Sequence, residues 1–168
     1  MPSEQGVAPG DALPLFELPD RSGNPHRLWA FKQRRPVVLY FAHSSPCAAC
    51  DDFVVRAAKG CEELAALNAV VIILFPGEAA ELPATLPVDS GRFLCVADSA
   101  GMAGARYLGS AARDEAALVA GTRYLDCAGV WRFACNHVAP DPDLAAAELR
   151  RADIADCGCA LFAWEESE

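Results

Sequence analysis

The 168-residue sequence lacks the features that define several classes of protein. No uninterrupted apolar run approaches the roughly 20 residues that a membrane-spanning helix needs, so we expect a soluble chain with no membrane partner. The segment Met1 to Gly6 has no basic stretch followed by an apolar one, so we predict no secretory signal and a cytoplasmic location. Basic residues are scarce, since 14 Lys and Arg face 23 Asp and Glu, and the net charge of −9 argues against nucleic-acid partners.

Repeats and low-complexity segments are also missing, and the remaining composition is globular, with 53% hydrophobic residues. The length fits one domain over residues 1–168. Residues 1–35 are rich in Pro and Gly and indicate an extended, partly stranded lead-in. Residues 152–168 form a C-terminal tail.

Apolar runs and turn residues predict the order of the secondary structure. Continuous apolar runs predict buried strands over 37–42, 69–75 and 92–97, and shorter runs predict two strands over 122–126 and 130–134. Helical spacing and capping residues predict helices over 47–68, 99–108 and 142–151. This order predicts an α/β fold with a mixed sheet, because right-handed crossovers make the early strands parallel.

Two cysteines, Cys47 and Cys50, follow the first buried strand at the start of the predicted helix. The positive end of a helix dipole stabilises a thiolate, so it lowers the thiol pKa from about 8.5 toward neutrality. With three-residue spacing, one thiol can attack a disulfide or peroxide and the other can resolve the product. The pair therefore predicts a redox-active dithiol, with no cofactor and no metal, and His43 is close enough in sequence to share a proton with it.

The other cysteines have several possible roles. Cys157 and Cys159 could form a tail dithiol that reduces the first pair by exchange. A second hypothesis joins these two thiols with Cys135 and His137 in a Cys₃His zinc site, although the spacing matches no usual zinc finger. Among the rest, two lie inside predicted elements and are most simply core thiols, namely Cys61 and Cys95.

Four pieces of the chain match a known pattern, namely residues 10–18, the run from Pro36 through Cys50, the segment Asp98 to Gly109, and the segment Thr122 to Gly129. Together they resemble the alkyl hydroperoxide reductase and thiol-specific antioxidant family, which is peroxiredoxin-like and has a thioredoxin fold. The resemblance implies a thioredoxin-like mixed sheet flanked by helices, with an N-terminal extension of the peroxiredoxin type. It also implies a disulfide or peroxide substrate and a thiol electron donor, such as a thioredoxin or a low-molecular-weight thiol.

The resemblance leaves three activities open. In relatives a proline or an arginine stands just before the strand that resembles 122–126, whereas this chain has Ala120 and Gly121 there. A dithiol reductase would use Cys47 as nucleophile and Cys50 as resolving thiol, whereas a thiol peroxidase would use either one as the peroxidatic cysteine. The third alternative is a redox-inactive module that binds a partner or holds zinc.

Overall fold

The structure of the protein is a computed structural model. It describes residues 14–31, 37–42, 55–56, 62–66, 68–82, 92–109, 117–121, 136–137 and 146–147. The predicted strands over 122–126 and 130–134 and the tail over 152–168 lie outside these residues. Of the predicted helix over 47–68, the described parts are helical at 55–56 and in α2 (Glu62–Ala66). Of the predicted helix over 142–151, residues 146–147 are helical, and Ala146 is fully buried.

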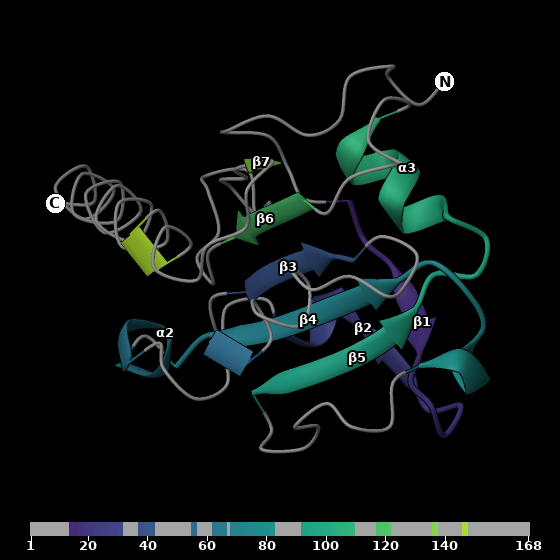
Figure 1. Ribbon diagram of the computed structural model, residues 1–168, viewed down its shortest axis with the longest axis horizontal. Helices are drawn as coiled ribbons and strands as arrows, with labels where there is room; N and C mark the ends of the chain where they lie inside the picture. The colour runs from purple at the N-terminus through teal and green to yellow at the C-terminus, as the bar shows by residue number, and fades with distance from the viewer. Residues whose placement is uncertain are drawn as a thin grey trace, which may run out of the picture.

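A five-stranded mixed sheet lies at the centre, in the order β5-β4-β3-β6-β7. Its strands are β3 (Val37–Phe41), β4 (Val70–Phe75), β5 (Phe93–Ala97), β6 (Ala117–Gly121) and β7 (Asn136–His137). β3, β4 and β5 are parallel, and β6 pairs antiparallel with β3 and with β7. The arrows of the three parallel strands point toward the end of the sheet where α3 lies, and the arrow of β6 points away from it (Figure 1).

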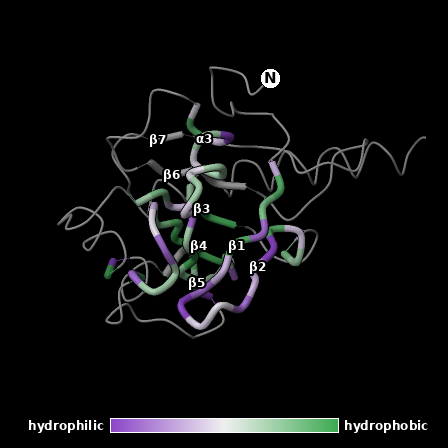
Figure 2. The backbone as a smooth tube through the Cα atoms, turned by 90° about the vertical axis from the view of Figure 1, so that its right-hand side faces the viewer, coloured by the Kyte–Doolittle hydropathy of each residue, from purple (hydrophilic) through white to green (hydrophobic). Residues whose placement is uncertain are grey.

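Burial explains the three parallel strands. All five residues of β3 are buried, and so are the first five of β4, which is why their sequences are apolar without alternation. Figure 2 places these apolar strands inside the molecule and shows hydrophilic residues around the β1–β2 hairpin. β4 ends at Phe75, where Pro76 and Gly77 follow, because proline cannot donate a ladder hydrogen bond and Gly77 has φ of 144°. The predicted strands over 37–42, 69–75 and 92–97 are confirmed.

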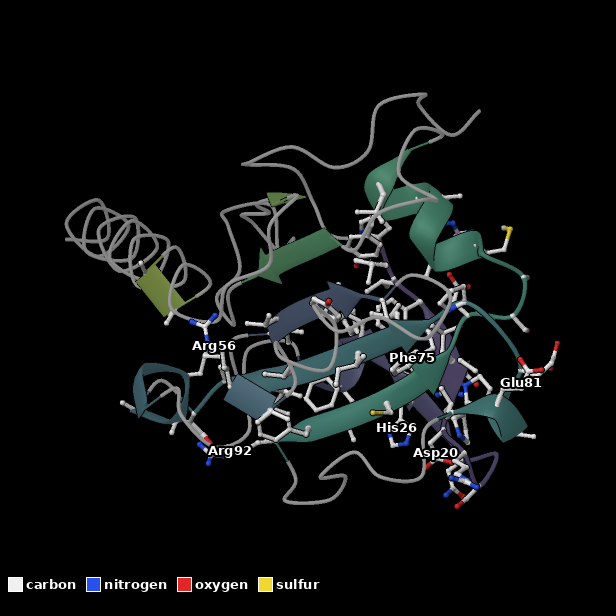
Figure 3. All side chains as sticks on the ribbon, viewed as in Figure 1. Asp20, His26, Arg56, Phe75, Glu81 and Arg92 are labelled. Carbon is white, nitrogen blue, oxygen red and sulfur yellow. The ribbon has the colours of Figure 1, made fainter. Side chains whose placement is uncertain are left out.

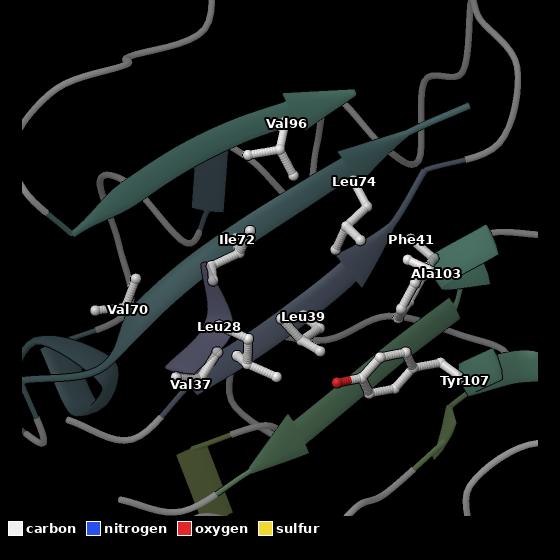
Figure 4. Packing of buried hydrophobic residues seen from close by; sticks show 10 residues of the cluster. All are labelled: Leu28, Val37, Leu39, Phe41, Val70, Ile72, Leu74, Val96, Ala103 and Tyr107. Atoms are coloured by element: carbon white, nitrogen blue, oxygen red, sulfur yellow. The ribbon is translucent and has the colours of Figure 1, made fainter. Parts of the chain in front are cut away.

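The helix α3 (Met102–Leu108) packs against one face of the sheet through Ala103 and Tyr107 (Figure 4). The Tyr107 ring is fully buried, with its centroid 5.4 Å from that of Phe41 in β3 and 6.3 Å from that of Phe16. Its hydroxyl donates a hydrogen bond to the carbonyl oxygen of Pro14. One side chain thus joins the helix, the sheet and the N-terminal lead-in.

The lead-in forms a second, two-stranded sheet, in which β1 (Glu17–Pro19) pairs antiparallel with β2 (Pro25–Arg27), followed by the 3₁₀ helix η1 (Leu28–Phe31). Asp20 organises the connection between the two strands. One carboxylate oxygen accepts the backbone N–H groups of Ser22 and Asn24, at 2.8 and 2.9 Å. For residues 14–31, which the structure describes, the prediction of a partly stranded lead-in is confirmed.

β6 was not expected from the sequence, which predicts a strand only from residue 122. The ladder pairs Ala117 with Phe41 and Gly121 with Val37, so the strand begins before the predicted one. The pairing with β3 determines the extended conformation of this segment, because its sequence has no alternation of apolar and polar residues that would indicate a strand.

Candidate functional site

A cavity of about 370 Å³ lies at the carboxyl ends of the parallel strands. β3 contributes Phe41 and the following Ala42, and β4 contributes Leu74 and the turn after it. The remaining wall consists of the connection from β5 to α3, which begins at Asp98, together with half-buried residues of α3. Ligands of open α/β sheets bind at this end of the strands, so this cavity is the candidate functional site.

Asp98 shapes the wall of the cavity that leads from β5 into α3. Its side chain is buried, with 5% of the residue exposed, and its backbone N–H donates to the carbonyl of Phe75 at 2.8 Å. The carboxylate accepts the N–H of Ala103 at 3.2 Å through Oδ1 and that of Gly104 at 2.8 Å through Oδ2. The carboxylate therefore caps α3 from a distance and holds the connection against the end of β4.

The predicted start of this helix at residue 99 is wrong. Gly101 has φ of 63°, a left-handed conformation, and the helix begins at Met102. Asp98 still satisfies two N–H groups of the first turn, as a capping residue does, but it does so across three intervening residues. The predicted end at Gly109 is confirmed.

Small residues make room for the cavity. Where α3 faces it, the lining includes Gly104 and Ala105, and where β4 ends it includes Gly77. A Cβ atom added to Gly104 would lie 3.6 Å from Asp98 Oδ2, which is ordinary contact. A Cβ added to Gly77 would lie 2.8 Å from Glu81 Oε2, so the Glu81 carboxylate lies beside the lining. Figure 3 shows Glu81 on η2 (Ala79–Glu81), beyond the end of β4 at Phe75.

The predicted thiol site directly follows the cavity-lining Ala42 in the sequence, but its residues lie outside the described part of the chain. His43, Cys47 and Cys50 all belong to the segment that follows Ala42, whose N–H donates to the Leu74 carbonyl at 2.9 Å. Their proposed roles stay predictions.

The C-terminal sites are untested as well. Cys135, Cys157 and Cys159 lie outside the described residues, and His137 is described only as backbone of β7. Within the described part of the chain, no three His, Cys, Asp or Glu side chains are close enough together to hold a metal ion. The tail dithiol and the zinc alternative therefore stay predictions.

Cys95 is the cysteine that the structure describes, and it is buried in β5. Desolvation raises the pKa of its thiol to about 12, because burial disfavours the charged thiolate. The prediction of a core thiol is confirmed for this residue, while Cys61 lies outside the described residues.

One expectation about this site is wrong. The sequence suggested that Ala120 and Gly121 occupy the place where relatives have a proline or an arginine before a strand. Both residues lie inside β6, paired with Val38 and Val37 at the amino end of β3. The cavity is at the carboxyl end of β3, where β6 begins with Ala117. The identity of residues 120 and 121 therefore says nothing against either a peroxidase or a disulfide reductase.

Sequence reasoning considers either Asp98 or Ser99 as the cap of this helix and does not assign either residue to a site. The signal was present, because a buried strand ends directly before it and Gly101, Gly104 and Gly109 follow at short intervals. Of these glycines only Gly109 was interpreted, as the end of the helix, whereas all three line the cavity. In the described helices we find none long and apolar enough to cross a bilayer.

Several solved structures with the same fold carry the names of redox proteins. Peroxidoxin BcpB from Mycobacterium tuberculosis has 20% identity and a TM-score of 0.64, over 86% of this chain and 97% of that one. A candidate thiol:disulfide interchange protein, DsbE, from Chlorobium tepidum has 20% identity and a TM-score of 0.62, over 90% and 99%. A thiol peroxidase from Chromobacterium violaceum has 15% identity and a TM-score of 0.61, over 89% and 90%.

These likenesses establish a thioredoxin-like α/β fold. No curated protein sequence matches the chain. The family assignment comes from a sequence model of the AhpC/TSA family, which matches residues 9–117, from the lead-in through the parallel strands and α3 to the start of β6. This protein belongs to the AhpC/TSA family of thioredoxin-fold redoxins.

Proposed function

We propose that the protein is a thiol-dependent oxidoreductase that reduces disulfide or peroxide bonds, with Cys47 as nucleophile and Cys50 as resolving thiol. The observation that carries the proposal is the position of Ala42, which lines the cavity directly after β3 and precedes Cys47 by five residues. An extended chain covers at most about 3.6 Å per residue, so the two Cα atoms lie within about 18 Å of each other. Family membership supports thiol chemistry at this end of the sheet.

With a disulfide substrate, the Cys47 thiolate attacks one sulfur, a mixed disulfide forms, and the other half of the substrate leaves as a thiolate. Cys50 then attacks the Cys47 sulfur and releases the second half as a thiol. The substrate gains two electrons, and the protein is left with a Cys47–Cys50 disulfide.

With a peroxide substrate, the thiolate attacks one oxygen, the O–O bond breaks, and water or an alcohol leaves. Cys47 becomes a sulfenic acid, and Cys50 condenses with it, with loss of water, to the same disulfide. We include peroxidase activity in the proposal because Ala120 and Gly121 lie inside β6, paired with the amino end of β3. The lack of an arginine at these two positions is therefore no argument against a peroxidase. Structural relatives described as peroxidases and as disulfide interchange proteins share the fold.

Both cycles end with a disulfide that an external thiol must reduce. A thioredoxin-like dithiol or two low-molecular-weight thiols supply the two electrons and become oxidised to a disulfide. Such donors are abundant in reducing compartments, so a cytoplasmic location is part of the proposal.

The test is to oxidise the reduced protein with one equivalent of hydrogen peroxide or of diethyl disulfide, alkylate it and map the labels by mass spectrometry. We expect Cys47 and Cys50 to lose their labels together. The Cys47→Ser variant should stay reduced, and the Cys50→Ser variant should stop at a sulfenic acid or a mixed disulfide. The Cys95→Ala variant is the matched control and should behave as wild type.

The two oxidants separate the two activities. A peroxidase consumes the peroxide rapidly and a reductase consumes the disulfide rapidly, as stopped-flow measurements under reducing conditions would show. Full alkylation of both cysteines after treatment with each of the two oxidants in turn would overturn the proposed function.

A further inference from the structure

The turn between β1 and β2 is built around one carboxylate. Asp20 Oδ1 accepts the backbone N–H groups of Ser22 and Asn24 at 2.8 and 2.9 Å, and Oδ2 accepts the side-chain amide of Asn24 at 3.1 Å. His26 lies opposite Leu18 in the ladder, and its Nε2 atom is 3.0 Å from the same Oδ2. Figure 3 shows His26 and Asp20 together at this hairpin. The imidazole therefore contacts the group that fixes the turn.

The pair formed by Asp20 and His26 changes its charge at moderate pH. Hydrogen bonds, first of all the one from His26, hold the pKa of Asp20 at about 2, so this carboxylate is ionised above about pH 4. Histidine is the side chain that ordinarily gains or loses its charge between pH 5 and 8. A protonated ring makes a charge-assisted hydrogen bond to a carboxylate, which is roughly twice as strong as a neutral one. Each side chain is 26% exposed, so solvent weakens the attraction less than at an open surface.

The other ionisable groups around the hairpin keep their charge in this pH range. Arg27 is paired with Glu17 across the two strands, and carboxylates and guanidinium groups ordinarily titrate at about pH 4 and above about pH 12. Among the elements that contact the hairpin, η1 has no ionisable side chain. β5 has the buried thiol of Cys95, which is neutral because desolvation raises its pKa to about 12. Within the described residues, His26 is therefore the group of this hairpin whose charge depends on moderate pH.

Arg21 connects the turn to the wall of the cavity. Its guanidinium donates to the carbonyl oxygen of Leu82 at 3.3 Å, and Leu82 directly follows η2. The carboxylate of Glu81 in η2 lies beside the cavity-lining Gly77, since a Cβ atom on that glycine would be 2.8 Å from Glu81 Oε2. Glu81 Oε2 also accepts the N–H of Glu78 at 3.3 Å, so both ends of η2 are held by side-chain hydrogen bonds. The position of η2 therefore depends in part on the turn that Asp20 fixes.

We propose that Asp20 and His26 form a pH-dependent switch, which holds the β1–β2 turn and, through Arg21, the η2 segment in place when His26 is protonated and loosens both when His26 is neutral. The proton is exchanged with solvent, and the switch acts through hydrogen bonds alone. An ion pair that exists only in the closed turn stabilises that turn below the pH at which the histidine titrates, and the stabilisation is lost above it. This inference goes beyond the proposed function and does not depend on thiol chemistry.

The test is amide hydrogen exchange of the whole protein, measured by NMR at pH 5.5 and 8.0, with each rate divided by the intrinsic rate at that pH. The reporters are the N–H groups of Ser22 and Asn24, which Asp20 accepts, and that of Leu82, which donates to the Ala79 carbonyl at 3.3 Å. We expect protection factors about threefold or more higher at pH 5.5, because a hydrogen bond to a charged partner is the stronger one.

The ring protons of His26 report the same event in the wild-type protein. Their titration midpoint should coincide with the midpoint of the change in protection at Ser22 and Asn24. Two midpoints that differ by a pH unit or more would assign the change to another group and would overturn the switch.

Two variants locate the origin of the pH dependence. His26→Gln keeps a hydrogen-bond donor for Asp20 but gains no charge, so its protection factors should be equal at the two pH values. Glu17→Gln breaks the other ion pair of the same hairpin, which does not titrate in this range, and is the matched control. It should keep the pH dependence of the wild type.

A third variant tests the connection to η2. Arg21→Met removes the donor to the Leu82 carbonyl and keeps an unbranched side chain. The pH dependence at Ser22 and Asn24 should persist in this variant, whereas that at Leu82 should disappear. An unchanged response of Leu82 would overturn the connection between the turn and η2.

Two further results would overturn the switch itself. One is equal protection of the wild-type turn at pH 5.5 and 8.0, and the other is an undiminished pH dependence in His26→Gln. None of these measurements uses turnover, so a switch that is present in a protein without thiol activity would overturn the proposed function alone.

Discussion

Replacement of Asp98 by alanine should destabilise the protein by about 2–5 kcal/mol. The carboxylate accepts the N–H of Gly104 at 2.8 Å and that of Ala103 at a longer 3.2 Å. A hydrogen bond to an ionised group contributes about 1.5–3 kcal/mol, and loss of a helix cap costs about 0.5–2 kcal/mol, so the stronger bond and the weaker one together give the stated range. Ala103 is 3% exposed, so water cannot easily replace the carboxylate at its N–H.

Asp98→Asn should cost roughly half as much, because the amide keeps one acceptor oxygen and turns its NH₂ group toward the other N–H. The measurement is urea unfolding followed by circular dichroism, with m-values compared so that a change in midpoint reports stability. Ser99→Ala is the matched control, since Ser99 is the exposed next residue of the same connection and should shift stability by less than about 0.5 kcal/mol. An Asp98→Ala variant as stable as this control would refute the capping role.

Two further predictions concern glycine strain and acid stability. Gly77→Ala should lower the melting temperature more than Gly101→Ala. A φ of 144° suits only glycine, and a Cβ there would also displace the Glu81 carboxylate, whereas Gly101 has a φ of 63° and open space around it. Equal shifts in calorimetry would contradict this. The hydrogen bond from His26 and those from nearby backbone hold the pKa of Asp20 at about 2, so its contribution to stability is complete above about pH 4 and is lost as the pH falls toward 2. Asp20→Asn should therefore unfold at a lower temperature than wild type at pH 5, and the difference should shrink by pH 2.5.

The parallel strands could be predicted from sequence because their cause is local. Each is a continuous apolar run that ends at residues unsuited to a strand, as Phe75 is followed by Pro76 and Gly77. The start of α3 could not be placed so well. Its first turn is capped by Asp98, which acts from four residues before Met102, and this arrangement depends on how β5 docks against β4.

β6 and the cavity depend on contacts between distant parts of the chain. The segment Ala117 to Gly121 has an alanine-rich sequence with little strand preference, and its pairing with β3 decides its conformation. The cavity joins Ala42, Leu74 and Asp98, which lie at or directly after the carboxyl ends of three different strands. Its shape is therefore a property of the assembled sheet, whereas the cysteine pair is visible in a few consecutive residues.

The buried Cys95 provides a check on the thiol assignment. Because desolvation raises its pKa to about 12, almost none of this thiol is ionised at pH 8, and its burial also blocks reagents. N-ethylmaleimide at pH 8 should therefore add the same number of labels to native wild type and native Cys95→Ala, whereas unfolded wild type should take up eight and the unfolded variant seven. One extra label on the native wild type would contradict the burial. Equal labelling would mean that any native thiol with a depressed pKa is another cysteine, and the pH dependence of labelling at Cys47 could then be measured without interference from β5.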